Sequence, residues 1–142
     1  MIIDVKTERV VYDKVPQTLV TIPLLSISST VAYPAKIDDV FEKAKDILKE
    51  VSWFGMEVSL HSTKGNSFEV SVTGFDLKEY IAMVVYCRRK SQGMTQKELA
   101  SACGYKSVNS VARIENGHDV PSLKTLVRIF DALGVSLSVV VK

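Results

Sequence analysis

The chain has 142 residues, of which 46% are hydrophobic and 24% are charged. This length can bury a core without disulfide or metal staples, and this composition excludes an intrinsically disordered chain. The net charge of +2 divides unevenly, because residues 1–75 hold 8 basic against 10 acidic residues (−2) and residues 76–142 hold 10 against 6 (+4). The basic second half predicts a module that binds a polyanion.

The sequence also bears on localisation and cofactors. No run approaches the ~20 apolar residues of a membrane span, and the first residues lack the basic region of a signal peptide. We therefore expect a cytoplasmic protein without membrane contact. Cys87 and Cys103 lie far apart in the sequence and have no histidine pair nearby. We expect two reduced thiols that pack as small apolar side chains, and neither a metal nor another cofactor.

The first third of the chain predicts extended structure. Residues 2–5, 9–12, 18–22 and 26–31 are rich in β-branched side chains, and Pro16, Pro23 and Pro34 punctuate them. This composition is typical of short strands separated by turns.

The pattern becomes helical at residue 37. Seven apolar residues recur at offsets 0, 3, 4, 7, 10, 11 and 14, which follow one face of a 3.6-residue helix, and charged residues of both signs fill the opposite face. The apolar set is Ile37, Val40, Phe41, Ala44, Ile47, Leu48 and Val51. An amphipathic helix lying on a sheet is the prediction.

After Gly55 the period changes to two. Apolar residues alternate with polar ones over residues 56–61 and 68–73, and the intervening Gly65 can adopt a positive φ. The pattern predicts a β-hairpin with one buried face. Gly74 marks the expected boundary, so residues 1–74 form an α+β domain and residues 75–142 form a second domain.

The α+β domain offers little for catalysis. Its one histidine, His61, falls at a solvent-facing position of the hairpin, and the domain has no cysteine. Asp38 and Asp39 are adjacent on a helix and point about 100° apart, so they do not share a site. Trp53 and Phe54 are expected to pack in the core or between domains, with a partner-binding anchor as the alternative. We expect no enzyme.

The second half predicts a series of helices. Asp76 can cap a helix over residues 77–91, whose apolar face contains Leu77, Ile81, Val84 and Cys87 with Tyr80 and Met83. Residues 95–98, Thr-Gln-Lys-Glu, have the pattern of a capping box that starts a second helix at Gln96. Gly104 permits a left-handed turn after that helix, as a helix-turn-helix requires.

A third helix over about residues 107–115 would bury Val108, Val111 and Ile114 and turn Asn109, Ser110 and Arg113 outward. Asparagine and arginine are the side chains that pair bidentately with adenine and guanine in the major groove. A fourth helix follows Pro121 and stops at Gly134. Residues 136–141 alternate and then run apolar, which predicts a terminal β-strand.

Several runs together resemble the Cro/C1-type DNA-binding domain of the XRE family. They are residues 94–100 (MTQKELA), Gly104, residues 111–117 (VARIENG), residues 121–123 (PSL) and residues 132–137 (ALGVSL). The resemblance implies a five-helix domain that binds double-stranded operator DNA, usually as a dimer, with the third helix in the major groove. Gln96 matches a family position that touches DNA, and Arg89 and Glu115 match a pair that ties the first helix to the recognition helix. The expected DNA-contacting residues are Gln96, Lys106, Ser107, Asn109, Ser110, Arg113 and Asn116.

The sequence departs from the commonest family pattern by one additional residue between Gly104 and Gly117. Val111 and Ile114 keep their spacing from Glu115, so the additional residue belongs to the turn or to the start of the helix.

The functional expectation is a sequence-specific transcriptional regulator, most simply a homodimeric repressor that reads an inverted repeat. Residues 1–74 would then mediate dimerisation or bind a partner. The alternative is an antitoxin of a toxin–antitoxin operon, in which residues 1–74 bind the toxin and the helix-turn-helix autoregulates transcription. That alternative rests on similar architecture alone.

Overall fold

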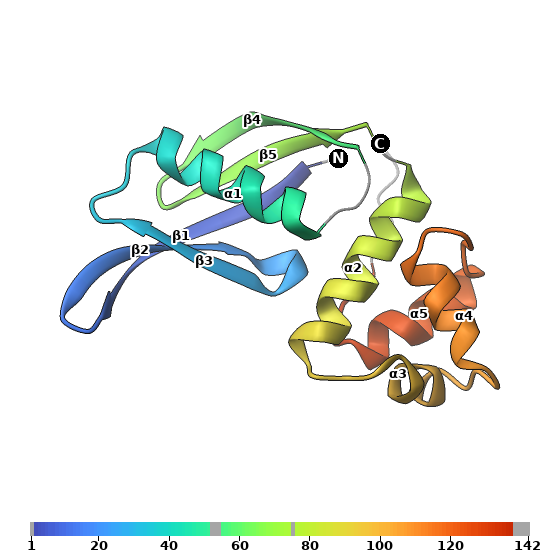
Figure 1. Cartoon of the computed structure of the whole chain (residues 1–142). Helices are drawn as coiled ribbons and strands as arrows, with labels where there is room; N and C mark the ends of the chain where they lie inside the picture. The colour runs from blue at the N-terminus through green and yellow to red at the C-terminus, as the bar shows by residue number, and fades with distance from the viewer. Residues whose placement is uncertain (1, 52–54, 75, 138–142) are drawn as a thin grey trace. The chain divides into compact units, whose positions relative to one another are not determined.

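A computed structural model describes residues 2–51, 55–74 and 76–137 (Figure 1). The chain divides into two compact units, Met1–Phe75 and Asp76–Lys142. The first unit is α+β and the second is helical, as the periodicities predict. Trp53 and Phe54 lie outside the described residues.

The first unit contains a five-stranded antiparallel sheet in the order β3-β2-β1-β5-β4. Its strands are β1 (Ile2–Tyr12), β2 (Val15–Ile22), β3 (Ile27–Ala32), β4 (Glu57–Lys64) and β5 (Ser67–Thr73), and a short 3-10 helix, η1 (Pro23–Leu25), follows β2. Two strands predicted over residues 2–5 and 9–12 are one strand, β1. Different neighbours hold its two halves, because β5 pairs with Ile2 to Lys6 and β2 pairs with Lys6 to Tyr12. The polar residues between the apolar runs therefore remain extended.

Helix α1 (Ile37–Val51) lies across one face of this sheet (Figure 1). Its buried side chains are Val40, Ala44, Ile47 and Leu48, which confirms the predicted apolar stripe, although Ile37 in the first turn is 46% exposed. Burial of one valine, leucine or isoleucine side chain stabilises the fold by about 1.5–3 kcal/mol. The buried partners on the strands are Ile3, Val5, Val20, Ile22, Phe68, Val70 and Val72.

Two hairpin turns differ in how well the sequence predicts them. Gly65 has a φ of +57°, as expected for the turn between β4 and β5. The turn between β1 and β2 consists of Asp13 and Lys14, with φ values of +49° and +67°. Two consecutive positive φ values are typical of a type I′ turn, which usually contains asparagine or glycine. This turn therefore has no strong signal in the sequence.

The predicted buried face of the β4–β5 hairpin is correct for β5 and wrong for part of β4. Phe68 and Val70 on β5 are buried, whereas Leu60 on β4 is 45% exposed. Strand β4 is the edge of the sheet, and its register shifts between Leu60 and Ser62. A bulge on an edge strand breaks the alternation of side chains. His61 is exposed, as predicted.

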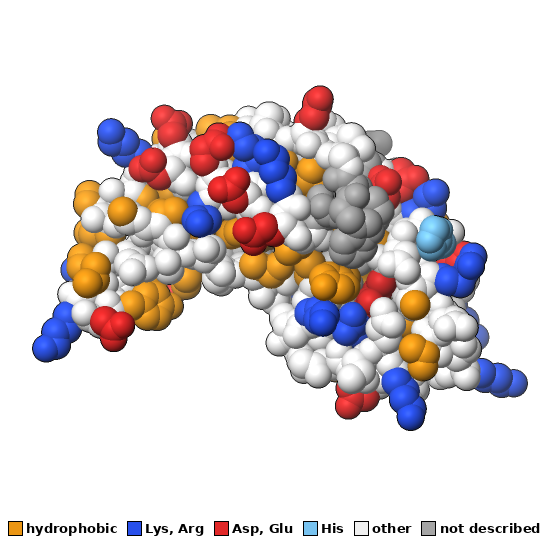
Figure 2. Space-filling view, viewed as in Figure 1, with side chains coloured by type: hydrophobic (Ala, Val, Ile, Leu, Met, Phe, Trp, Pro, Cys, Tyr) orange, Lys and Arg blue, Asp and Glu red, His pale blue; other side chains and the backbone are white. Residues whose placement is uncertain are grey.

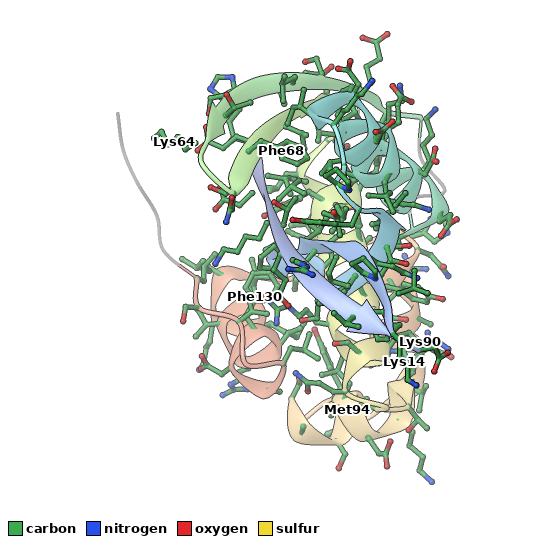
Figure 3. All side chains as sticks on the ribbon, turned by 90° about the vertical axis from the view of Figure 1, so that its left-hand side faces the viewer. Lys14, Lys64, Phe68, Lys90, Met94 and Phe130 are labelled. Atoms are coloured by element: carbon green, nitrogen blue, oxygen red, sulfur yellow. The ribbon has the colours of Figure 1, made fainter. Side chains whose placement is uncertain are left out.

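The second unit contains α2 (Leu77–Ser91), α3 (Gln96–Ala102), α4 (Val108–Glu115) and α5 (Leu123–Ala132). Asp76 and Thr95 cap the first two of these helices, and each forms a capping box with the glutamate three residues later. Figure 3 labels one core aromatic residue of each unit, Phe68 on β5 and Phe130 on α5. The buried residues on α3, α4 and α5 are Leu99, Ala100, Val111, Ile114, Glu115, Ile129 and Phe130.

Four details of the second unit differ from expectation. Its described residues form four helices where the family resemblance implies five. Ser136 and Leu137 belong to no strand, and the rest of the predicted strand over residues 136–141 lies outside the described residues. Leu77 is 65% exposed and Val108 is 38% exposed, because each is the first residue of its helix and no preceding turn covers it.

Among the described helices, none is long and apolar enough to span a membrane.

Candidate nucleic-acid interface

Helices α3 and α4 are joined by a sharp turn that begins at Cys103. Gly104 has a φ of +73°, as predicted, and the Tyr105 amide donates to the Ala100 carbonyl over 2.9 Å. A Cβ at Gly104 would meet no atom within 4 Å, so the conformation alone favours glycine here. Ser107 caps α4 by accepting from the Asn109 amide. Lys106 and Ser107 therefore lie in the turn, and α4 starts at Val108.

One side of α4 is buried and the opposite side faces solvent. Each residue advances a helix by about 100°, so Asn109, Arg113 and Asn116 lie on one side. All three are exposed. Val111, Ile114 and Glu115 on the other side are buried. Ser110 is half-buried at the margin, and Lys106 and Ser107 are exposed beside the start of the helix. The structure thus brings six of the seven predicted DNA-contacting residues to α4 and its flanking turns.

Gln96, the seventh, starts α3 and is half-buried. Its side-chain amide donates to Oε2 of Glu115 over 2.8 Å. The residue therefore joins α3 to the end of α4. Sequence reasoning missed this bond, because the two residues are 19 positions apart and their types alone give no signal of contact.

Arg89 and Glu115 form a buried ion pair, as the family resemblance implies. Nε of Arg89 donates to Oε1 over 2.5 Å and Nη2 donates to Oε2 over 2.9 Å, with the side chains only 7% and 3% exposed. Nη1 of Arg89 donates to the Met94 carbonyl over 2.8 Å. The hydrogen bond to Glu115 raises the pKa of Arg89, so the guanidinium stays charged. This pair fixes α4 against α2 and the start of α3.

Arg113 forms a second ion pair, on the surface. Nε donates to Oδ2 of Asp119 over 2.6 Å and Nη2 donates to Oδ1 over 2.9 Å, and the two side chains are 59% and 44% exposed. The interaction raises the pKa of Arg113 and lowers the pKa of Asp119. The predicted base-reading arginine thus has an intramolecular partner that its position in the sequence does not reveal.

The helical unit has further exposed cations that were not among the predicted contacts. Lys97 lies on α3, and Lys124 and Arg128 lie on α5. Figure 2 shows Lys and Arg side chains projecting from several parts of the helical unit. The net charge of +4 signals such cations, but only the fold identifies which of them reach solvent.

The two cysteines are buried, as the packing interpretation expects. Burial, together with the charge of Glu115, raises the pKa of the Cys87 thiol to about 12, and burial also raises the pKa of Cys103. In the described part of the chain, no three His, Cys, Asp or Glu side chains are placed to hold a metal ion.

A thiol reagent provides a test of this burial. Because a raised pKa means less thiolate, both cysteines of the native protein are expected to react at pH 8 at least tenfold more slowly than in denaturant. Colorimetric thiol titration with and without guanidinium measures the two rates. Equal rates would show that the thiols are accessible.

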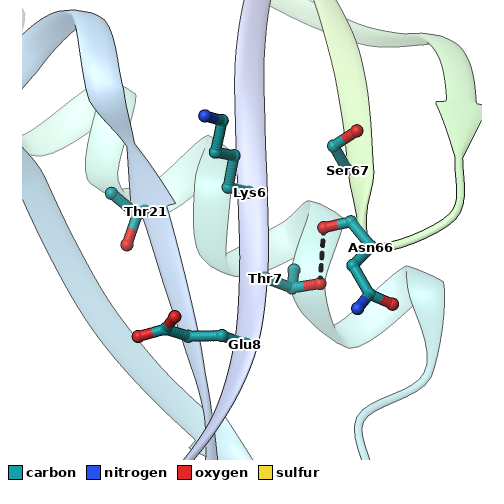
Figure 4. A pocket seen from close by; sticks show the side chains of 6 residues that line it. All are labelled: Lys6, Thr7, Glu8, Thr21, Asn66 and Ser67. Atoms are coloured by element: carbon teal, nitrogen blue, oxygen red, sulfur yellow. Dashed lines mark hydrogen bonds between the residues drawn. The ribbon is translucent and has the colours of Figure 1, made fainter.

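The first unit has an open hollow of about 400 Å³ on its sheet (Figure 4). Lys6 and Glu8 on β1 point toward Thr21 on β2, whereas Thr7 points the other way and donates to the Asn66 carbonyl. Its lining contains no histidine or cysteine, and Lys6 and Glu8 are exposed.

Comparison with known families identifies the second unit. Residues 88–140 match the family model described as helix-turn-helix. The second unit therefore contains a helix-turn-helix, which confirms the resemblance to the Cro/C1 type over residues 88–140, and this match supports a DNA-binding transcription regulator. No curated protein matches the chain.

Proposed function

We propose that the protein is a homodimeric transcriptional repressor that reads an inverted-repeat operator with α4 in the major groove. The observation that carries this proposal is the outward side of α4, where Asn109, Arg113 and Asn116 are exposed opposite the buried face. The side-chain amide of asparagine can form two hydrogen bonds with adenine, and the guanidinium of arginine can form two with guanine. This side of the helix can therefore distinguish bases. The protein acts by binding rather than by catalysis.

Exposed lysines of the helical unit supply the affinity that does not depend on DNA sequence. Lys97 and Lys106 lie on α3 and in the turn before α4, and Lys124 lies in the first turn of α5. Cations placed beside a recognition helix contact phosphates, which orients the protein and makes binding weaken with salt.

Arg113→Ala tests the role of α4. The substitution is expected to cost about 1–3 kcal/mol of specific binding, because a bidentate contact to one base is lost, and to leave non-specific affinity nearly unchanged. Fluorescence anisotropy with an operator selected from a random DNA library, and with a scrambled duplex, measures both affinities. Equal losses on the two duplexes would contradict base reading by Arg113.

Dimerisation is supported by two apolar residues on α5. Leu123 and Val127 are 64% and 40% exposed and lie four residues apart, so they share one side of the helix. One helix-turn-helix reads only a few base pairs, and two heads on a two-fold operator provide the required specificity. A symmetric dimer would cover these side chains.

Light scattering coupled to size exclusion tests the dimer. We expect about twice the 15.7 kDa mass of one chain, and a monomer when Leu123 and Val127 are both changed to lysine. Lys124→Ala and Arg128→Ala on the same helix should leave the mass unchanged. A wild-type mass near that of one chain, constant with concentration and on operator DNA, would contradict the dimer.

The antitoxin function is a second candidate, favoured by the end of the β1–β2 hairpin. Val11, Tyr12 and Val15 there are 60%, 51% and 55% exposed, and grouped apolar side chains at a surface fit a protein partner. In this candidate the partner is a toxin, bound by the first unit. Co-expression with the product of an adjacent reading frame tests it, because an antitoxin should relieve growth arrest that the neighbour causes alone. Unrelieved arrest would count against this function.

A further inference from the structure

The ion pair between Arg113 and Asp119 uses one edge of the guanidinium. A guanidinium has five N–H groups, one on Nε and two on each terminal nitrogen. Asp119 accepts one from Nε and one from Nη2. Among the described residues, no group accepts from the other three, which are the two on Nη1 and the second on Nη2. The end of the guanidinium, formed by Nη1 and Nη2, is therefore open.

This open end is the edge that guanine recognition needs. Guanine presents two neighbouring acceptors in the major groove, O6 and N7, and arginine contacts both at once. A fork of two parallel N–H groups matches two such acceptors. Arg113 can consequently hold Asp119 with its side edge and guanine with its end edge, so the two interactions do not compete for the same donors.

The backbone fixes Asp119 next to the last turn of α4. The amides of His118 and Asp119 both donate to the Arg113 carbonyl, over 2.9 and 3.4 Å, and the Gly117 amide donates to the Ile114 carbonyl over 3.0 Å. Gly117 has a φ of +68°, which turns the chain back toward the helix. The carboxylate is thus held by the same helical turn that carries the guanidinium. The ion pair thus holds the guanidinium of an otherwise exposed side chain against this turn.

We propose that Asp119 is a positioning residue for base recognition, which holds the guanidinium of Arg113 so that its open end faces a guanine in the operator. This inference rests on the proposed reading of DNA by α4. Asp119 itself does not contact the base. Its contribution is preorganisation, because an arginine already held in the bound orientation loses less freedom when the complex forms.

The charge of Asp119 alone predicts the opposite effect. DNA is a polyanion, so removal of one carboxylate near the interface should strengthen binding to every duplex. Positioning predicts instead that operator binding weakens while binding to scrambled DNA is unchanged or stronger. The sign of the change in operator affinity therefore separates the two effects.

The experiment compares Asp119→Asn with Asp131→Asn, which removes one exposed carboxylate from α5 as a matched control. Each variant and the wild type are titrated with the selected operator, with a scrambled duplex, and with operators in which single guanines are replaced by 7-deazaguanine, which lacks the N7 acceptor. Thermal melting first checks that each variant is folded. For Asp119→Asn we expect the ratio of operator to scrambled affinity to fall about tenfold, whereas Asp131→Asn should keep the wild-type ratio.

The loss of affinity caused by 7-deazaguanine is a second readout, which would not change if Asp119 only stabilised the fold. In the wild type, one 7-deazaguanine substitution should weaken binding about tenfold, and Asp119→Asn should lose most of this sensitivity. Retained sensitivity with equal or tighter operator binding would overturn the positioning role, as would the absence of any sensitive guanine. If Arg113→Ala leaves specificity intact, the assignment of Arg113 fails. If only Arg113→Ala reduces specificity, the proposed function stands and this inference alone fails.

Discussion

Replacing Glu115 by alanine is expected to lower the free energy of unfolding of the helical unit by about 3–5 kcal/mol, because Arg89 would remain charged and buried without its partner. The two side chains are 7% and 3% exposed and share two hydrogen bonds. Gln96 would lose its bond to the same carboxylate. In a domain of this size, such a loss lowers the melting temperature by roughly 12 °C or more.

Circular dichroism melts check this expectation, with two controls. Glu98→Ala removes an exposed capping glutamate and should lower the midpoint far less than Glu115→Ala does. The double variant Arg89→Met with Glu115→Leu removes both charges and should recover much of the loss, because no buried charge is left unpaired. An unchanged midpoint for Glu115→Ala would mean that water solvates the pair.

Leu48→Ala should produce a similarly large loss in the first unit. Leu48 lies on α1 with no exposed surface, against the sheet. Removal of its isobutyl group leaves a cavity, and such substitutions cost about 2–5 kcal/mol. Ile37→Ala is the matched control, because Ile37 lies on the same helix and is 46% exposed.

Hydrogen exchange followed by mass spectrometry measures where Leu48→Ala acts. We expect faster exchange in α1 and in β2 and β3, the strands that α1 packs against. Denaturant unfolding gives the free energy itself. A loss as large in Ile37→Ala, or unchanged exchange in these elements, would contradict the role of Leu48 in the core.

Features set by neighbouring residues are predictable from this sequence. The apolar period of α1, the capping boxes at Asp76 and Thr95 and the turn at Gly104 each depend on residues within a few positions, and the structure contains all of them. The same holds for the outward side of α4, because a helix of known phase places Asn109 and Arg113 opposite its apolar residues. Local spacing thus determined the helix-turn-helix and most of its candidate DNA-contacting surface.

Pairings between distant residues were decided by the tertiary structure. The continuity of β1 depends on two different neighbouring strands, and the exposure of Leu60 depends on β4 being the edge of the sheet. Gln96 approaches Glu115 only because α3 and α4 pack together, and Arg113 meets Asp119 only because the chain turns back at Gly117. Hydrogen bonds and ion pairs require atoms to approach within about 3 Å. Residue types and spacing along the chain do not fix such distances, whereas the packing of helices and strands does.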